Sequence, residues 1–256
     1  MSHLHDHAQT PTSAELESIP VPPLAPYRFI KPSVSYVLLI LALWCSLLVP
    51  SLKSSLATNM RAPTGGPLGF LASFLMTNIN TPTIIDVVAR MNPTSTDHWL
   101  ELGPGAGIGL QALYKITTPA SVTVVEVSER FAEDLKTAPT DLSAVWNPTI
   151  LTDDARQLPT IATGTITKIM AVNVVYFLDP LPEYLTELKR VLAPNGQVLF
   201  ACKFHLVSTN GPPFVNVSLE SVLKAFESVG GFEVRVEEVA MEERKFDYTA
   251  ITATKI

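Results

Sequence analysis

From about residue 97 onward, short apolar runs alternate with stretches in which apolar residues recur at helical spacing. The expected strands read HWLEL, VTVVEV, TKIMAVN and QVLFACKF, with a further short strand near residues 145–151. The expected helices between and after them read SERFAEDLKTA, LPEYLTELKRVL and SLESVLKAFESV. Strands that alternate with helices form a parallel sheet covered by helices on both faces. The alternation therefore predicts an α/β domain with a doubly wound, mostly parallel sheet over residues 96–256.

Two further strands are expected at the C-terminus, where FEVRVEEVAM and YTAITATKI follow one another with no helix between them. Strands joined by a short connection pair antiparallel, because a parallel crossover needs a dozen or more residues. We expect these two strands as a hairpin-like pair at the edge of the sheet.

An uncharged apolar segment precedes this domain. Residues 33–52 read SVSYVLLILALWCSLLVPSL, and no charged side chain lies between Lys31 and Lys53. The 17 residues between Pro32 and Pro50 span roughly 25 Å of helix, the short end for a membrane span. Charged residues make up only 16% of the chain, which also fits a lipid-facing segment. We expect one transmembrane helix over residues 33–52, with a cleaved targeting segment or a buried core helix as the alternatives.

The other N-terminal segments carry weaker signals. Residues 1–32 form a polar, proline-rich tail with no apolar period, which predicts disorder. Residues 53–95 are expected to form a connector with two short cap helices, LASFLM and TPTIIDVVARM. Thr81 is the expected N-cap of the second helix, because Pro82 is tolerated in a first helical turn.

The first strand of the domain runs into a glycine-rich loop, GPGAGIG, at residues 103–109. Glycines let a backbone turn sharply and approach a ligand closely, and the helix that follows offers unpaired amides. The dinucleotide fingerprint Gly-x-Gly-x-x-Gly fails in both registers, because its last position falls on Ile108 or Leu110. A phosphate-binding P-loop fails as well, because no Gly-Lys-Ser or Gly-Lys-Thr follows.

Three acids lie at successive strand ends around this loop. Glu101 comes two residues before the first glycine, where a carboxylate would repel a pyrophosphate but suit an ammonium group. Glu126 ends the second strand, where a carboxylate can accept hydrogen bonds from both hydroxyls of a ribose. Asp154, in TDDARQLP after the third strand, could accept a hydrogen bond from the exocyclic amine of an adenine. The order of the three acids indicates a ligand site.

This constellation resembles the class I S-adenosylmethionine-dependent methyltransferases. HWLELGPGAGIG looks like their glycine-rich first motif, VTVVEVSERF like the ribose-binding segment, and TDDARQLP like the adenine-contacting step. The stretch from IMAVNVVYFLDP to RVLAPNGQVLFACKF is similar to the small-molecule, ubiquinone/menaquinone-biosynthesis-like (methyltransferase type 11) subgroup. The resemblance covers about residues 80–256, and it implies a Rossmann-like, seven-stranded sheet with an antiparallel last strand.

The resemblance also implies the site residues and the cofactor, S-adenosyl-L-methionine. The expected cofactor contacts are Glu101, Gly103, Gly105, Gly107, Glu126, Asp154, Ala155 and Asn173. Candidates on the acceptor side are Asn173 and Tyr176 after the fourth strand and His205 after the fifth. A sulfonium methyl is already activated, so a protein mainly aligns the acceptor and excludes water. A general base is needed only where the acceptor must lose a proton.

Charge and cysteine content narrow the function classes. A net charge of −6 and a pI near 5.4 argue against general binding of a nucleic-acid backbone. Asn173-Val174-Val175-Tyr176 is comparable to the Asn-Pro-Pro-Tyr motif of nucleic-acid amino methyltransferases, but both prolines are missing. Cys45 and Cys202 are too few for a disulfide scaffold or a cysteine-only zinc site, and no metal site is expected.

The sequence therefore favours a membrane-anchored methyltransferase for a small, apolar or lipid-like acceptor, with no nucleic-acid partner; it leaves the oligomeric state open. The alternatives are a catalytically silent fold that binds cofactor or a partner, and a nucleic-acid amino methyltransferase. Basic residues flank the apolar segment evenly, so they do not orient it. Because the cofactor is expected in the cytosol or an organelle matrix, the catalytic domain is expected on that side.

Overall fold

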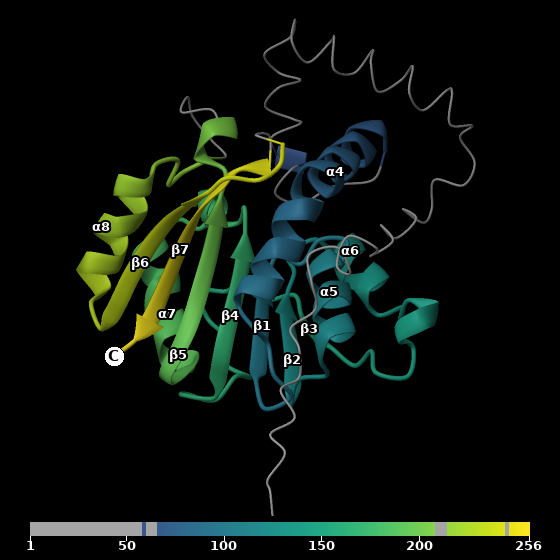
Figure 1. Ribbon diagram of the computed structural model, residues 1–256, viewed down its shortest axis with the longest axis horizontal. Helices are drawn as coiled ribbons and strands as arrows, with labels where there is room; N and C mark the ends of the chain where they lie inside the picture. Colours follow the sequence, from purple (N-terminus) through teal and green to yellow (C-terminus); the bar gives the residue numbers. More distant parts are fainter. Residues whose placement is uncertain (1–57, 60–65, 208–213, 244–245) are drawn as a thin grey trace, which may run out of the picture.

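The computed structural model describes residues 58–59, 66–207, 214–243 and 246–256. At its centre lies a seven-stranded sheet in the order β3-β2-β1-β4-β5-β7-β6 (Figure 1). The strands are β1 (His98–Leu102), β2 (Ser121–Val125), β3 (Thr149–Leu151), β4 (Ile166–Val172), β5 (Leu192–Cys202), β6 (Phe232–Val239) and β7 (Tyr248–Lys255). Strands β1 to β5 pair in parallel, and β7 pairs antiparallel with both β5 and β6. The predicted seven-stranded sheet with an antiparallel last strand is confirmed.

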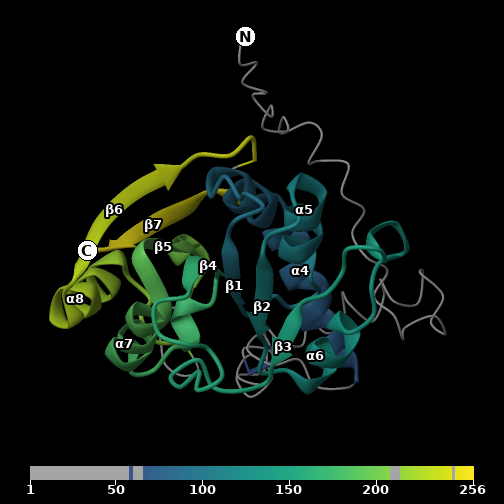
Figure 2. The ribbon, with the colours of Figure 1, turned by 90° about the horizontal axis from the view of Figure 1, so that it is seen from below.

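Helices cover both faces of this sheet, as Figure 2 shows. The helices are α4 (Pro67–Arg90), α5 (Ile108–Ile116), α6 (Glu129–Leu135), α7 (Leu181–Val191) and α8 (Leu219–Val229). Three short 3-10 turns join them, η1 (Thr140–Leu142), η2 (Val175–Phe177) and η3 (Phe204–Leu206). The arrangement is the doubly wound α/β architecture that the alternating sequence predicts.

Alternation along the strands builds one hydrophobic core on each face. In β5, Val198, Phe200 and Cys202 pack with α7 and α8, whereas Leu199 and Ala201 pack with α4 and α5. Successive side chains of a strand point to opposite faces, so a strand covered on both sides is apolar at nearly every position. This explains why the expected strands appear as unbroken apolar runs.

The cap segment differs from the prediction. The structure has one helix, α4, with Pro82 inside it, where two short helices were expected. Thr81 is not an N-cap, because its hydroxyl donates to the carbonyl of Thr77 at 2.6 Å. Proline lacks one amide donor, but the C-terminal half of α4 buries Val87 and Val88 completely against the sheet. Tertiary packing therefore carries the helix through the proline.

The third strand is also shorter than predicted, since β3 begins only at Thr149. Both Val145 and Trp146 donate their backbone amides to the carbonyl of Leu142, which continues the turn of η1. The indole nitrogen of Trp146 then donates to the carbonyl of Leu135 at 2.9 Å. The apolar residues at 145–146 thus pack onto the α5 and α6 side instead of extending the sheet.

The expected transmembrane helix at residues 33–52 lies outside the described residues, as do the proline-rich tail and residues 53–57 and 60–65 of the connector. Within the part of the chain that the structure describes, no helix combines the length and apolar character needed to cross a bilayer.

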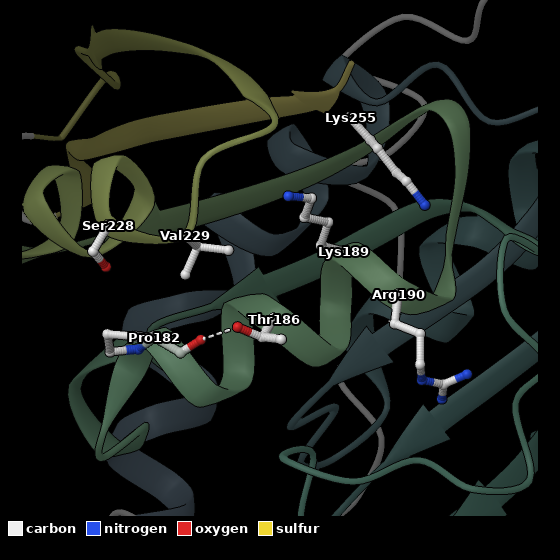
Figure 3. Close-up of a pocket in the computed structure, with 7 residues that line it drawn as sticks. All are labelled: Pro182, Thr186, Lys189, Arg190, Ser228, Val229 and Lys255. Atoms are coloured by element: carbon white, nitrogen blue, oxygen red, sulfur yellow. Dashed lines mark hydrogen bonds between the residues drawn. The ribbon is translucent and has the colours of Figure 1, made fainter.

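A basic surface cleft lies between α7, α8 and the end of β7 (Figure 3). Lys189 donates to the carbonyl of Gly230 at 2.9 Å, and Lys255 donates to the carbonyl of Leu192 at 2.6 Å. Arg190 pairs with Glu187 at 2.7 Å. Cations at the C-terminal end of a helix are stabilised by its dipole, so these contacts account for the cluster as a structural feature.

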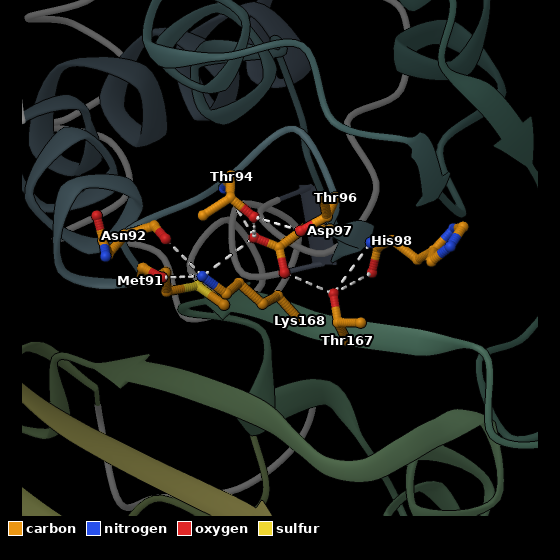
Figure 4. A network of polar contacts seen from close by, with 8 residues as sticks. All are labelled: Met91, Asn92, Thr94, Thr96, Asp97, His98, Thr167 and Lys168. Carbon is orange, nitrogen blue, oxygen red and sulfur yellow. Dashed lines mark hydrogen bonds and ion pairs between the residues drawn. The ribbon is translucent and has the colours of Figure 1, made fainter. Parts of the chain in front are cut away.

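At the amino ends of the strands, a polar clamp holds the C-terminal end of α4 (Figure 4). The ammonium of Lys168 donates to the carbonyls of Met91 and Asn92 at 2.5 and 2.6 Å. Its charge is balanced by Asp97, whose carboxylate lies 3.2 Å away. Asp97 also accepts hydrogen bonds from the Thr94 amide and the Thr167 hydroxyl. The clamp fixes α4 at the end of the sheet opposite to the cavity described next.

Candidate functional site

A cavity of about 520 Å³ opens at the carboxyl ends of β1, β2, β4 and β5. The arrowheads of β4 and β5 mark this edge of the sheet in Figure 1. Its walls come from α4 between Ser73 and Ile84, the glycine-rich loop after β1, the segments that follow β2, β3, β4 and β5, and Phe214. Open α/β sheets bind ligands at this edge, where loops from several strands converge.

The glycine-rich loop lines this cavity with residues 103–106. Gly103 and Gly105 have φ of +63° and +54°, a backbone region that side chains disfavour. A Cβ on Gly103 would lie 2.9 Å from Val174, whereas one on Gly105 would meet only Phe131 at 4.0 Å. The open space beside Gly105 therefore belongs to the cavity.

The other two glycines of the loop serve packing. Gly107 is buried and does not line the cavity; a Cβ there would lie 2.8 Å from Leu135. A Cβ on Gly109 would lie less than 2.5 Å from the Glu101 carboxylate. Gly109, which sequence reasoning did not single out, thus lets the carboxylate of Glu101 lie directly against α5.

Glu101 is a buried acid on the cavity wall, only 3% exposed. Its Oε2 atom has no hydrogen-bond partner among the described residues. Burial, followed by the nearby charge of Glu126, raises the pKa of Glu101 to about 8. A buried carboxylate with a free oxygen on a cavity wall is suited to receive a cationic donor such as an ammonium group.

Glu126 is held in place by two backbone amides. Its Oε2 accepts from the amide of Gly105 at 3.0 Å and its Oε1 from the amide of Ser128 at 2.8 Å. Burial raises the pKa of Glu126, while these two amides oppose the rise by stabilising the carboxylate. Each carboxylate oxygen accepts one of the bonds it can form, so both can accept another from a diol.

Asp154 and Ala155 follow β3, and both line the cavity. Ala155 is buried, whereas the side chain of Asp154 is 40% exposed and pairs with Arg156 at 2.7 Å. Burial raises the pKa of Asp154, but the hydrogen bonds and charge of Arg156 outweigh it and the net pKa is lowered. Asp154 therefore presents an ionised acceptor at the rim.

Asn173 lines the cavity, and its side chain connects η2, α4 and the segment after β5. Its side-chain oxygen accepts from the Tyr176 hydroxyl at 3.3 Å and from the Lys203 amide at 3.1 Å. Its side-chain nitrogen donates to the side chain of Asn80 on α4 at 2.9 Å. Asn173 adopts a φ of +55°, which asparagine tolerates better than most residues. Its contacts place Asn173 as a positioning residue for Tyr176 and α4.

The fold brings the predicted residues together with two exceptions. Gly107 packs away from the cavity, and His205 is exposed on η3 and does not line it. Lys203, two residues before His205, is instead on the cavity wall and only 2% exposed. Sequence reasoning passed over Lys203 because a lysine after a strand is ordinarily a surface residue.

The family-model comparison covers most of the strands that build this site. Residues 100–200, from β1 through β5, match the model of a methyltransferase domain. Over these residues the chain is similar to a methyltransferase domain. The resemblance of its motifs to the class I S-adenosylmethionine-dependent methyltransferases is confirmed.

Solved structures share the fold of this methyltransferase domain. The CurJ carbon methyltransferase is 17% identical with a TM-score of 0.55, over 73% of this chain and 58% of that one. A SAM-dependent methyltransferase from Aquifex aeolicus is 21% identical with a TM-score of 0.52, over 67% of this chain and 89% of that one. Magnesium protoporphyrin IX methyltransferase from Synechocystis PCC 6803, solved with bound SAH, is 15% identical with a TM-score of 0.54, over 71% and 85%. No curated protein matches the sequence. At these identities, the shared feature is the fold.

Proposed function

We propose that the protein binds S-adenosylmethionine in this cavity and transfers its methyl group to a small, apolar acceptor. One observation carries the proposal: Glu101 and Glu126, both 3% exposed, lie on one cavity wall beside the glycine-rich loop, with Asp154 at the rim. Two buried acids without an ion-pair partner among the described residues are costly unless a ligand supplies donors or positive charge.

The residues fit the chemical groups of this cofactor one by one. The free oxygen of Glu101 suits the ammonium of the methionyl part, and the two oxygens of Glu126 suit the two ribose hydroxyls. Asp154 suits the exocyclic amine of adenine, and Ala155 lines the cavity beside it. The open space at Gly105 leaves room for close approach of a ligand to the backbone.

When bound, S-adenosylmethionine supplies a sulfonium methyl: the acceptor's lone pair forms the new bond to carbon while sulfur keeps the electrons of the broken bond. The protein contributes alignment and exclusion of water. Asn173 and Tyr176 line the cavity and are joined by a hydrogen bond, and apolar side chains of α4 together with Leu206, Val207 and Phe214 would form its acceptor end.

We further propose that residues 33–52 anchor the protein in a membrane, which would present the acceptor end to lipid-like molecules. The uncharged sequence of that segment supports the anchor. The mostly apolar lining of the acceptor end supports an apolar acceptor. The catalytic domain would face the cytosol or an organelle matrix, where the cofactor is available.

The alternatives are less well supported by the described residues. A silent fold would not need Glu101, Glu126 and the glycine-rich loop assembled around one cavity. A nucleic-acid amino methyltransferase would use the Asn173 side chain on its substrate, but here both ends of that side chain bond to protein groups.

Calorimetric titration of the full-length protein with S-adenosylmethionine and, separately, with NADH tests the cofactor. Binding of the first and not the second is expected, and the reverse result would overturn the proposal. Transfer of a labelled methyl group into a lipid extract then tests activity. Cofactor binding without transfer into lipid or polar small-molecule extracts would favour the silent fold.

A further inference from the structure

The acceptor end of the cavity has an aromatic wall. Tyr176, Phe177 and Phe214 line it, and the ring of Tyr176 meets that of Phe214 edge-on at a centroid distance of 6.4 Å. Phe204, which does not line the cavity, meets the Tyr176 ring edge-on at 5.9 Å. The rings of Phe177 and Phe214 are tilted against each other at 5.3 Å. Other apolar residues that line this end are Met76, Ile79, Ile84, Leu206 and Val207. Aromatic side chains prefer offset or edge-to-face contacts with a planar ligand, so this wall suits an aromatic or conjugated acceptor.

Lys203 places a cation in this apolar wall. It directly follows β5, and its ammonium donates to the carbonyl of Ile79 on α4 at 2.5 Å. The ammonium also lies 5.5 Å from the centre of the Phe246 ring. Lys203 forms no ion pair with any carboxylate among the residues that the structure describes. An ammonium has three N–H donors. One bonds to the Ile79 carbonyl, and the other two have no acceptor among the described residues and can bind a ligand.

The titratable groups near Lys203 differ in whether they can change protonation near neutral pH. Tyr176 lines the same cavity, and Cys202 precedes Lys203 in the chain; burial raises the pKa of each, so both keep their protons. Burial lowers the pKa of Lys203 to about 8, although the charge of Asp247, before β7, opposes this shift. Glu101 and Glu126 line the cofactor end of the same cavity. Among the described residues that line the acceptor end, Lys203 is therefore the group that can exchange a proton near neutral pH.

We propose that Lys203 binds a phenolic or enolic hydroxyl of the acceptor and takes its proton, so that this oxygen receives the methyl group. The lone pair of the neutral amine forms the new N–H bond, and the electrons of the O–H bond stay on oxygen. The resulting ammonium holds the oxyanion, and the proton leaves to solvent after methyl transfer. An anion in an apolar cavity requires such a cation. This inference rests on the proposed function and names its acceptor class.

The test uses 4-nitrophenol, whose anion has a distinct absorption band, with full-length protein saturated with S-adenosylhomocysteine. Wild-type protein is expected to bind the phenol as its anion, and so to lower its apparent pKa. Lys203→Met is expected to weaken phenol binding by at least about tenfold, the scale of a charge-assisted hydrogen bond, and to abolish the pKa change. The methyl ether, 4-nitroanisole, should bind equally to both proteins.

Lys189→Met is the matched control. Its ammonium also donates to a backbone carbonyl, but it lies in the surface cleft of Figure 3, lined by other residues. This variant is expected to behave as wild type with both probes. A phenol that fails to bind, binds without ionising, or ionises equally in Lys203→Met would overturn the inference.

Calorimetry of S-adenosylhomocysteine with the same variants separates this inference from the proposed function. Unchanged affinity in Lys203→Met is expected, and it also shows that the variant folds. A tenfold or greater loss would reassign Lys203 to the cofactor and overturn the inference while the proposed function stands. If wild-type protein does not bind S-adenosylhomocysteine, the proposed function itself fails.

Discussion

At the scale of single residues, two glutamates that look alike in the sequence have different surroundings. Glu126 has both oxygens oriented by the amides of Gly105 and Ser128, whereas Glu101 has an oxygen with no described partner. The first is therefore a preorganised acceptor for neutral donors, and the second is suited to a cation. The predictions at this scale follow from that difference.

Glu126→Ala is expected to weaken S-adenosylmethionine binding by about 1.5–3 kcal/mol, because hydrogen bonds to a charged group have this strength. Calorimetric titration measures the loss. Glu133→Ala is the matched control, since Glu133 is exposed on α6 and pairs only with Lys136 at 2.6 Å. An unchanged affinity in Glu126→Ala would remove Glu126 from the cofactor site.

Binding of S-adenosylmethionine at pH 7 is expected to release a proton from Glu101. With a pKa of about 8, this acid is mostly protonated without ligand, and it must ionise to pair with an ammonium group. Calorimetry at pH 7 in two buffers of different ionisation enthalpy counts the protons. Glu101→Gln should bind more weakly and release one proton fewer; equal proton counts in both proteins would contradict the pairing.

The same acid should affect stability without ligand. Its folded-state pKa of about 8 lies above the ordinary value of 4.5, so its contribution is complete below pH 4.5 and is lost as pH rises through about 8. Urea unfolding should show wild-type protein losing stability relative to Glu101→Gln across this range.

At the scale of elements, α4 joins the two ends of the sheet. Its C-terminal end is clamped through Lys168 and Asp97, and farther toward its N-terminus it contributes Ser73, Thr77 and Asn80 to the cavity wall. Hydroxyls of Ser73 and Thr77 bond to carbonyls of the helix itself, four residues earlier. Ser73 and Thr77 are thus buried in the helix with their hydroxyls paired.

Asp97→Asn is expected to lower the free energy of unfolding by about 1.5–3 kcal/mol at pH 7, because the ammonium of Lys168 loses its counterion. Burial raises the pKa of Asp97. The hydrogen bonds from Thr94 and Thr167 and the charge of Lys168 lower it by more, so the net pKa lies below 3.8. The contribution is therefore present above pH 3.8 and is lost as pH falls through the folded-state pKa.

Urea unfolding of wild type and Asp97→Asn between neutral and acidic pH checks both statements. Thr96→Ala is the control, because Thr96 is exposed and its described bond is to the Thr94 hydroxyl alone. Equal stability of Asp97→Asn and wild type at pH 7 would show that the clamp contributes nothing.

At the scale of the whole molecule, the proposed anchor predicts how the protein behaves in cells. Leu41→Arg should cost about 2.5–3.5 kcal/mol of membrane insertion, because a charge would lie near the centre of the span. Deletion of residues 1–53 should release a protein that still binds S-adenosylmethionine. Membrane fractionation and calorimetry measure these outcomes. Extraction of full-length protein by carbonate without detergent would contradict the anchor.

The orientation is tested in sealed vesicles with the cytosolic side outward. For a cytosol-facing enzyme, added protease should digest the catalytic domain without detergent. Protection of that domain would place it on the other side of the membrane.

The sequence by itself determined the strand and helix order, the glycine-rich loop and the three acids at strand ends. Each of these is a local pattern: strands and helices have their own periods, and the carboxyl ends of parallel strands share one edge. Glu101, Glu126, Asp154, Asn173 and Tyr176 could therefore be assigned to one site from the sequence alone, and all five line the cavity.

Only the tertiary structure decided which neighbours meet across the fold. It runs α4 through Pro82 because the second half of the helix is buried against the sheet. It turns Gly107 toward Leu135, leaves His205 exposed, and brings the ammonium of Lys203 to the carbonyl of Ile79, 124 positions earlier. Such contacts depend on long-range packing, and a local pattern carries no information about the distant residue that completes them.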